Sequence, residues 1–501
     1  MESLNKVFGS NWLRGKIIVM LIALFILSCE KDELCTICQE ENQSETNQPP
    51  IAVAGADQEI MLPNNSVLLN GNTSSDQYGI TDFTWEKIEG PDSYLIVTPK
   101  LSRTWIEGLV EGVYQIELTV TNTLGLLAKD TLKVTVLPGL CDYSNRVEVN
   151  AHLTEIGTLP QLRDGMAVVT SGNKIFFAGG YISSRIDIYD IDSQSWTTAE
   201  LSIARYDITT VANGNKVYFA GGLIYDSITE DELTVDTVDI YDIDTDTWTT
   251  TNLSTARYGM LATVVDNKVL FVGGYGSNGD RVDIFDQSSS EWTTASLSEN
   301  KLDGYAAVTS GNKVYIAGGK YCTYNPDHSI NCTASANIDV YDNTTNTWSI
   351  ETMYEGKFSF AGIAFDDKIY FAGGSTGFYS DYNSTSNNIY YPSTLVEIRD
   401  PSTGNSTIEC LFKGGNQNCQ AVQQDDKIVF FSFSRWLTQQ VAINFDIYDS
   451  SNNNWYYGEF PDDISFHPNK IISVNNIIYM AGGTINGIAS NKLYIIEFDG
   501  L

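Results

Sequence analysis

The sequence is short of positive charge. It has 29 Lys and Arg residues against 63 Asp and Glu residues, which gives a formal net charge of −34 at pH 7. A face that binds nucleic acid must neutralise phosphates with basic side chains, so this balance argues against DNA or RNA as a partner. The same acidity favours solubility but identifies no ligand.

The chain has only a short apolar run near its start. The run IIVMLIALFIL covers 17–27, too few residues to cross a bilayer as a helix, and it fits the hydrophobic region of a secretory signal. It ends in ILSC, which resembles a bacterial lipobox and implies that Cys29 is lipidated; the alternative is an ordinary signal peptide with a chance cysteine. The next residues, EKDE, resemble the sorting sequence of Bacteroidota surface lipoproteins. We therefore expect a signal peptide at 1–28 and an outer-membrane lipid anchor that faces the cell exterior.

Cysteines are few, and seven of the eight follow Cys29. In an oxidising compartment their default state is a disulfide. Two pairs bracket short loops, which predicts the bridges Cys322–Cys332 and Cys410–Cys419. An odd number remains, and in CTIC two of them could form half a zinc site or a redox pair, although no second ligand pair lies nearby. The remaining cysteines are Cys35, Cys38 and Cys141.

No long helical pattern interrupts the first ninety or so residues after the signal. Residues 29–50 are polar and read as a flexible tether. Residues 51–137 contain short runs of alternating apolar and polar residues, such as VYQIELTV, separated by turn residues. Such a pattern predicts a two-sheet sandwich. The segments PPIAVAGADQEI, FTWEKIEGP and GVYQIELTVTNTLG resemble a PKD domain, an immunoglobulin-like module that mostly serves as a spacer.

The rest of the chain is repetitive. After a linker at 138–146, apolar runs that end in two glycines recur, as in GNKVYFAGG and DNKVLFVGG. The first glycines stand at 179, 221, 273, 318, 373 and 482, and DDKIVFFSF supplies a degenerate unit between the last two. Most units also carry a second signature, such as VDIYDIDTDTW, in which an aromatic residue stands seven residues before a tryptophan.

Together these markers resemble the kelch repeat of a β-propeller. Seven units over 147–501 imply seven four-stranded blades, so the predicted fold is all-β: a PKD-like sandwich followed by a seven-bladed kelch propeller. We expect the double glycine to provide positive φ and room where neighbouring backbones approach. The last unit ends after three strands, so a strand at 147–156 is expected to complete it and close the ring.

Catalytic patterns are weak. Some kelch-like proteins are copper oxidases, which need two histidines and a cysteine-linked tyrosine; the sequence has only His152, His328 and His467, and no match to that tyrosine is evident. Kelch-like epimerases use carboxylate and arginine, but no local motif identifies such a pair. The run DIDTDTW has calcium-loop spacing but lacks the glycine and the distal glutamate, so a turn is the better interpretation. We predict no catalytic residues, no metal and no cofactor.

Basic residues recur at one phase of the repeat. They stand about sixteen residues before the double glycine, in the loop that enters each blade, and kelch propellers commonly bind partners at that face. Two interpretations stay open: each base pairs with a nearby acid such as Asp207 and fixes a turn, or the bases ring a pocket for an anionic group. The candidate residues are Arg163, Arg205, Arg257, Lys301, Lys357 and His467.

The sequence therefore predicts a lipid-anchored, cell-surface binding module whose ligand, a glycan or a protein, lies at the propeller mouth. It would contact the membrane only through its anchor. A sugar-acting enzyme of the kelch class and a structural adhesion or scaffold protein are the alternatives.

Overall fold

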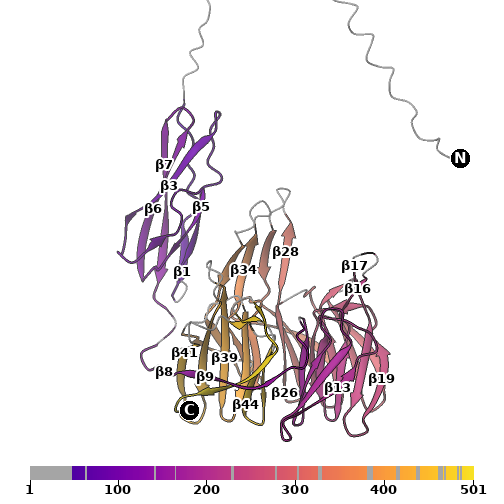
Figure 1. The fold of residues 1–501 in the computed structure, drawn as a ribbon. Helices are drawn as coiled ribbons and strands as arrows, with labels where there is room; N and C mark the ends of the chain where they lie inside the picture. The colour runs from indigo at the N-terminus through magenta and orange to yellow at the C-terminus, as the bar shows by residue number, and fades with distance from the viewer. Residues whose placement is uncertain are drawn as a thin grey trace, which may run out of the picture. The chain divides into compact units, whose positions relative to one another are not determined.

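The computed structural model describes residues 48–501, with short gaps. The gaps are 63–64, 140, 142, 164, 227–228, 230, 277–278, 302–303, 325–329, 381–387, 413–417, 436–440, 461–465, 468–469, 482–483 and 486–487. Cys29, Cys35, Cys38 and His328 lie outside the described residues. Within them every regular element is a strand, which confirms the all-β prediction (Figure 1).

The first domain is a sandwich of two sheets. One sheet has the order β1 (Gln58–Met61), β7 (Leu127–Leu137), β6 (Gly112–Asn122) and β3 (Ile80–Glu89). The other has the order β2 (Val67–Asn70), β5 (Arg103–Glu107) and β4 (Leu95–Ile96). Alternate residues of β6 are buried, among them Tyr114, Ile116 and Leu118, so the period-two pattern places one face of this strand on the core.

The repeats form antiparallel sheets of four strands, which we number as blades 1 to 7. Blade 1 contains β10 (Ala167–Ser171), β11 (Lys174–Ala178), β12 (Arg185–Asp190) and β13 (Ser195–Glu200). Blade 2 contains β14 (Thr209–Asn213), β15 (Lys216–Ala220), β18 (Thr237–Asp242) and β19 (Thr247–Asn252). Blade 3 contains β21 (Leu261–Val265), β22 (Lys268–Val272), β24 (Arg281–Asp286) and β25 (Glu291–Ser296).

Blades 4 to 7 repeat this order. Blade 4 contains β26 (Tyr305–Ser310), β27 (Lys313–Gly318), β30 (Asn337–Asp342) and β31 (Thr347–Thr352). Blade 5 contains β32 (Ala361–Phe365), β33 (Lys368–Ala372), β36 (Leu395–Arg399) and β37 (Ser406–Cys410). Blade 6 contains β38 (Asn418–Gln424), β39 (Lys427–Arg435), β40 (Val441–Asp449) and β41 (Asn454–Glu459). Blade 7 contains β43 (Lys470–Val474), β44 (Ile477–Ala481), β47 (Lys492–Phe498) and β9 (Ala151–Thr158).

The innermost strands of consecutive blades contact each other in a closed cycle. β10 contacts β14, the contacts continue through β21, β26, β32 and β38 to β43, and β43 returns to β10. Blade 7 takes its outer strand from the start of the repeats, because β9 pairs antiparallel with β47. This closing strand ends two residues later than the range expected from the sequence. The preceding β8 (Val147–Glu148) belongs instead to blade 6, where it pairs parallel with β41.

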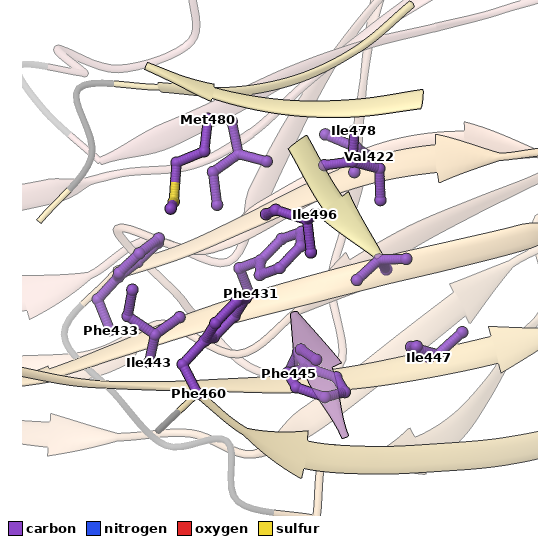
Figure 2. Packing of buried hydrophobic residues seen from close by; sticks show 13 residues of the cluster. Val422, Phe431, Phe433, Ile443, Phe445, Ile447, Phe460, Ile478, Met480 and Ile496 are labelled. Carbon is purple, nitrogen blue, oxygen red and sulfur yellow. The ribbon is translucent and has the colours of Figure 1, made fainter. Parts of the chain in front are cut away.

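Apolar side chains fill the space between blades. Figure 2 shows the cluster between blades 6 and 7, where Phe431 and Phe445 lie near Met480 and Ile496. At the interface of blades 1 and 2, Tyr241 stacks on Trp248 at 4.8 Å between ring centroids and also contacts Phe176 of the preceding blade. Large buried aromatic faces of this kind stabilise the ring, which is the role expected of the repeated Tyr and Trp.

The structure corrects one disulfide prediction. Cys322 and Cys332 are bonded, as the sequence predicted. Cys410 is bonded to Cys141 rather than to Cys419, and Cys419 is a buried free thiol whose pKa is raised to about 12 by desolvation. Because Cys141 precedes β8, the bridge ties the linker to the end of blade 5. The short loop between Cys410 and Cys419 is what made the wrong pair attractive.

Among the described residues, no helix has the length and hydropathy that crossing a membrane would require.

Candidate binding face

Arg205 shows what the repeated basic residues do. Its side chain is fully buried, and Nη1 lies 2.9 Å from Oδ2 of Asp239 on the third strand of blade 2. Nε donates to the carbonyl of Gly221 at 3.0 Å, and Nη2 donates to the carbonyl of Phe219 at 3.0 Å. Burial lowers the pKa of this guanidinium, while Asp239 acts to raise it. The base therefore fastens the entering loop to its own blade.

The other described bases follow the same rule. Arg163 pairs with Asp187 and donates to the carbonyl of Gly179 at 2.7 Å. Arg257 pairs with Asp283 and donates to the carbonyl of Gly273 at 2.6 Å. In each case the acceptor is the first residue of the double glycine, which is why the spacing of sixteen residues recurs. The chain must return along two strands before it meets the base again.

The lysines of blades 4 and 5 are a variation on this arrangement. Lys301 donates to the carbonyl of Gly318 at 2.8 Å and lies 2.9 Å from Oε1 of Glu299. Lys357 lies 3.3 Å from Oε1 of Glu355, and burial lowers the pKa of its ammonium. Both lysine side chains are only 1% exposed.

The third-strand acids also hold the loop backbone. Oδ2 of Asp239 accepts the N–H of Ser202 at 3.1 Å, and Oδ1 of Asp283 accepts the N–H of Ser254 at 3.0 Å. Blade 6 has no base at the expected phase, and its acid, Asp446, instead meets Arg146 from the linker, 3.2 Å from Nη1. The N-terminal segment thus supplies the missing cation.

These contacts correct the hypothesis that the bases ring an exposed anion site. Desolvated cations that already have carboxylate and carbonyl partners offer little to a ligand. The pairing interpretation is right in kind but wrong in partner, because Arg205 contacts Asp239 and not the nearby Asp207. His467 is described only through its backbone, in β42 (Phe466–His467), which pairs with β45 (Thr484–Ile485). The buried bases are Arg163, Arg205, Arg257, Lys301 and Lys357.

The run DIDTDTW forms a turn, as expected. Oδ1 of Asp242 accepts the N–H of Asp244 at 3.1 Å and the N–H of Thr245 at 3.2 Å. Asp246 accepts a hydrogen bond from the hydroxyl of Tyr241 at 2.9 Å. Across the described part of the chain, no three His, Cys, Asp or Glu side chains gather as a metal site would require.

Insertions build up one face of the ring. They follow the second strand of a blade, at the end where the entering loops also lie, and we call this the mouth face. Figure 1 shows β16 and β17, and β28 and β34, reaching beyond the ends of the blade strands. The insertion strands are β16 (Leu223–Asp226) with β17 (Asp231–Thr234), β20 (Arg257–Tyr258) with β23 (Tyr275–Gly276), β28 (Lys320–Tyr324), β29 (Ile330–Ala334), β34 (Ser375–Ser380) and β35 (Asn388–Pro392) in one sheet, and β46 (Ile488–Ala489) beside β45.

Five tyrosines of blades 1 to 3 gather on the mouth face. The ring of Tyr181 lies 5.6 Å from that of Tyr206 and 5.3 Å from that of Tyr225. Tyr258 stacks on Tyr275 at 5.2 Å. Tyr181 is 49% exposed and the other four rings are half-buried. We call these five residues the tyrosine patch.

Carboxylates border the tyrosine patch. The hydroxyl of Tyr206 donates to Oε1 of Glu232, an exposed residue of β17. Desolvation raises the pKa of Tyr206, and the nearby charges of Glu232 and Asp207 raise it further. The same two carboxylates contribute to the raised pKa of Tyr258, after desolvation, which shows that both halves of the patch share one acidic surrounding.

The sequence analysis missed this patch, although a signal was present. Arg-Tyr occurs in two successive entering loops, at Tyr206 and Tyr258, and a tyrosine follows the double glycine directly at Tyr181 and Tyr275. Only the arginines of these motifs were considered. The buried member of each pair fixes the loop, and its neighbour presents the aromatic ring.

Comparison with known proteins identifies both parts of the chain. Residues 54–136 match the family of KIAA0319-like PKD domains. Residues 145–319 match the KLHDC2/KLHL20/DRC7 Kelch-repeats domain. The first domain is thus a PKD domain, and it is followed by kelch repeats, as predicted.

Individual relatives share only the PKD segment. The dyslexia-associated protein KIAA0319 homolog of Rattus norvegicus is 40% identical over 94 residues, which is 19% of this chain and 9% of the relative. The low-density lipoprotein receptor-related protein 11 of Homo sapiens is 35% identical over 95 residues, 19% of each chain. The chain thus spans less than a fifth of the length of these relatives. A solved structure described as the structure of YjhT aligns at a TM-score of 0.44 and 14% identity, over 60% of this chain and 98% of that one.

Proposed function

We propose that the propeller is a non-catalytic protein-interaction or adhesion module that binds its partner through the tyrosine patch. We further propose that a lipid on Cys29 holds the chain at the outer surface of the outer membrane. The observation that carries the binding proposal is the gathering of five partly exposed tyrosines from three blades on one face of a rigid ring. Tyrosine offers a large, stiff contact area at low entropic cost and is enriched in the cores of protein interfaces.

The charges around the patch favour a partner with lysine or arginine side chains. Glu232 and Asp207 are exposed carboxylates beside the rings, whereas the nearest bases, Arg205 and Arg257, are buried and already paired. A cation that lies over a tyrosine face and near a carboxylate gains both a cation–π and a Coulomb interaction. A basic protein segment therefore fits this surface better than an acidic one.

The proposal can be tested with a lysine- and arginine-rich synthetic peptide and its glutamate counterpart, titrated against the full-length chain by fluorescence anisotropy. We expect the basic peptide to bind, the acidic one to fail, and added salt to weaken binding. The double variant Tyr258→Ala with Tyr275→Ala should lose about tenfold or more in affinity, since buried interface aromatics are frequent hot spots. Ile477→Ala is the control, because Ile477 is an exposed apolar residue in a turn at the other end of a blade.

Equal affinity of the double variant and the parent, with matching thermal melts, would remove the patch from the binding site. A glycan array offers the competing outcome. Saturable binding of a neutral glycan that is lost in the double variant, without binding of the basic peptide, would replace the protein partner with a carbohydrate.

A further inference from the structure

A cavity of about 210 Å³ lies where the central channel opens toward the mouth face. Its walls come from the innermost strands of blades 1, 2, 3 and 7 and from the residues that immediately precede them. Met166, Ile208 and Met260 supply an apolar lining, and each is at most 8% exposed. Thr209, Thr210 and Lys470 supply the polar groups. A mostly apolar hollow with a few convergent polar groups is the usual form of a small-molecule site.

Lys470 is the only charged side chain among the lining residues. Its Nζ donates to the carbonyl oxygen of Val168 at 3.3 Å, on the free edge of β10. That oxygen also accepts a hydrogen bond from the hydroxyl of Thr210 at 3.3 Å. An ammonium group has three donors. Within the described residues, no carboxylate forms an ion pair with Lys470, so two donors remain for another acceptor.

Lys470 thus differs from the other bases near the double glycines. Lys301 and Lys357 are fixed by carboxylates, while Lys470 has one long contact with a carbonyl. The side chain keeps contact with the channel, yet desolvation by the surrounding protein lowers the pKa of its ammonium. An anion in the cavity would compensate this charge and favour its protonated form.

The threonines leave room for such an anion. The hydroxyl of Thr209 donates to the carbonyl of Met260 at 2.9 Å, and that of Thr210 donates to Val168. Both donors are therefore engaged, so the ammonium group is the donor that is left to hold an anionic ligand. The methionine and isoleucine side chains would then contact the rest of that ligand.

We propose that this cavity binds a small aliphatic carboxylate, with its carboxylate against Lys470 and its hydrocarbon chain against Met166, Ile208 and Met260. The site is separate from the tyrosine patch, and the two proposals can fail independently.

The test is a calorimetric titration of the full-length chain with sodium butyrate, with butanol and butylamine as matched neutral and cationic probes. We expect saturable binding of butyrate alone. Lys470→Met, which keeps the length of the side chain, should weaken it about tenfold to a hundredfold, as the loss of a charge-assisted hydrogen bond implies. Lys470→Arg should retain binding, and Lys368→Met, at an exposed lysine on another strand, should not change it.

A second measurement needs no loss of charge at Lys470. Lysines of the parent chain are reductively methylated with carbon-13, and Lys470 is identified as the signal that is missing in Lys470→Arg. Its pKa should rise as butyrate is added. Butyrate binding that is equal in the parent and in Lys470→Met, or a Lys470 signal that butyrate does not shift, would overturn the proposal and leave Lys470 as a cap on the edge of β10.

Discussion

At the residue scale, the double glycine and the buried base form one unit. The N–H of Gly222 donates to the carbonyl of Arg257 at 3.0 Å, and the N–H of Gly180 donates to that of Arg205 at 3.2 Å. The end of one blade is therefore bonded to the base of the next. A side chain on the first glycine would overlap that same carbonyl, so the repeated glycine serves blade contact and binds no phosphate.

Two glycines with almost the same backbone separate strain from crowding. Gly221 has φ of +62° and a Cβ there would overlap the carbonyl of Arg257, whereas Gly214 has φ of +61° and open space around it. Gly214→Ala should cost about 1–2 kcal/mol from the left-handed conformation alone. Gly221→Ala should lower the melting temperature much further. Equal shifts of the two melting temperatures would mean that the blades do not meet at this carbonyl.

Arg205 allows a direct test of the buried pairs. Arg205→Met leaves Asp239 buried without its cation, and such a loss typically costs about 3–5 kcal/mol. We expect a clearly lower denaturation midpoint in urea. Lys368→Met, at an exposed lysine, is the control and should change stability by less than about 0.5 kcal/mol. A midpoint for Arg205→Met like that of the control would show that the guanidinium is dispensable for the fold.

At the element scale, the ring depends on a segment outside the repeats. β9 completes blade 7, β8 joins blade 6, and the disulfide of Cys141 with Cys410 anchors both. Without β9 the outer edge of β47 would be unpaired and free to pair with another chain. The two linked strands therefore act as a clasp that fixes the order of the last two blades.

Two truncations test this clasp. A chain that begins at residue 138 lacks the PKD domain but keeps β8 and β9, and its propeller should melt close to the parent transition. A chain that begins at residue 159 also lacks both strands and the partner of Cys410, and it should melt at a much lower temperature or aggregate. Differential scanning calorimetry would distinguish these outcomes. Closely matched transitions for both truncations would contradict a closing role for β9.

At the scale of the whole molecule, an acidic chain gains nothing from an anionic membrane surface. Attachment through the lipid proposed on Cys29 would then be the main membrane contact. In cells fed a labelled fatty acid, the parent chain should become labelled and Cys29→Ala should not. Protease added to intact cells should remove the propeller. Full labelling of Cys29→Ala, or complete protection from protease, would contradict the proposed anchor or its orientation.

The sequence by itself determined the class of the fold. Strand alternation, the repeated double glycine and the recurring tyrosine and tryptophan are local patterns, and each one is visible within a single unit. The pair Cys322–Cys332 could be predicted for the same reason, because its partners are 10 residues apart in one hairpin. The spacing of the bases was visible too, and one of its two interpretations was right in kind.

Only the tertiary structure decided which partners meet. Cys141 and Cys410 are 269 residues apart, and Arg146 reaches Asp446 from outside the repeats, so no local pattern could pair them. The same holds for burial: Arg205 looks like a surface base in its loop, but the neighbouring blade covers it. Lys470 lacks a carboxylate among the described residues because it begins an innermost strand at the channel, a position that exists only once the ring has closed.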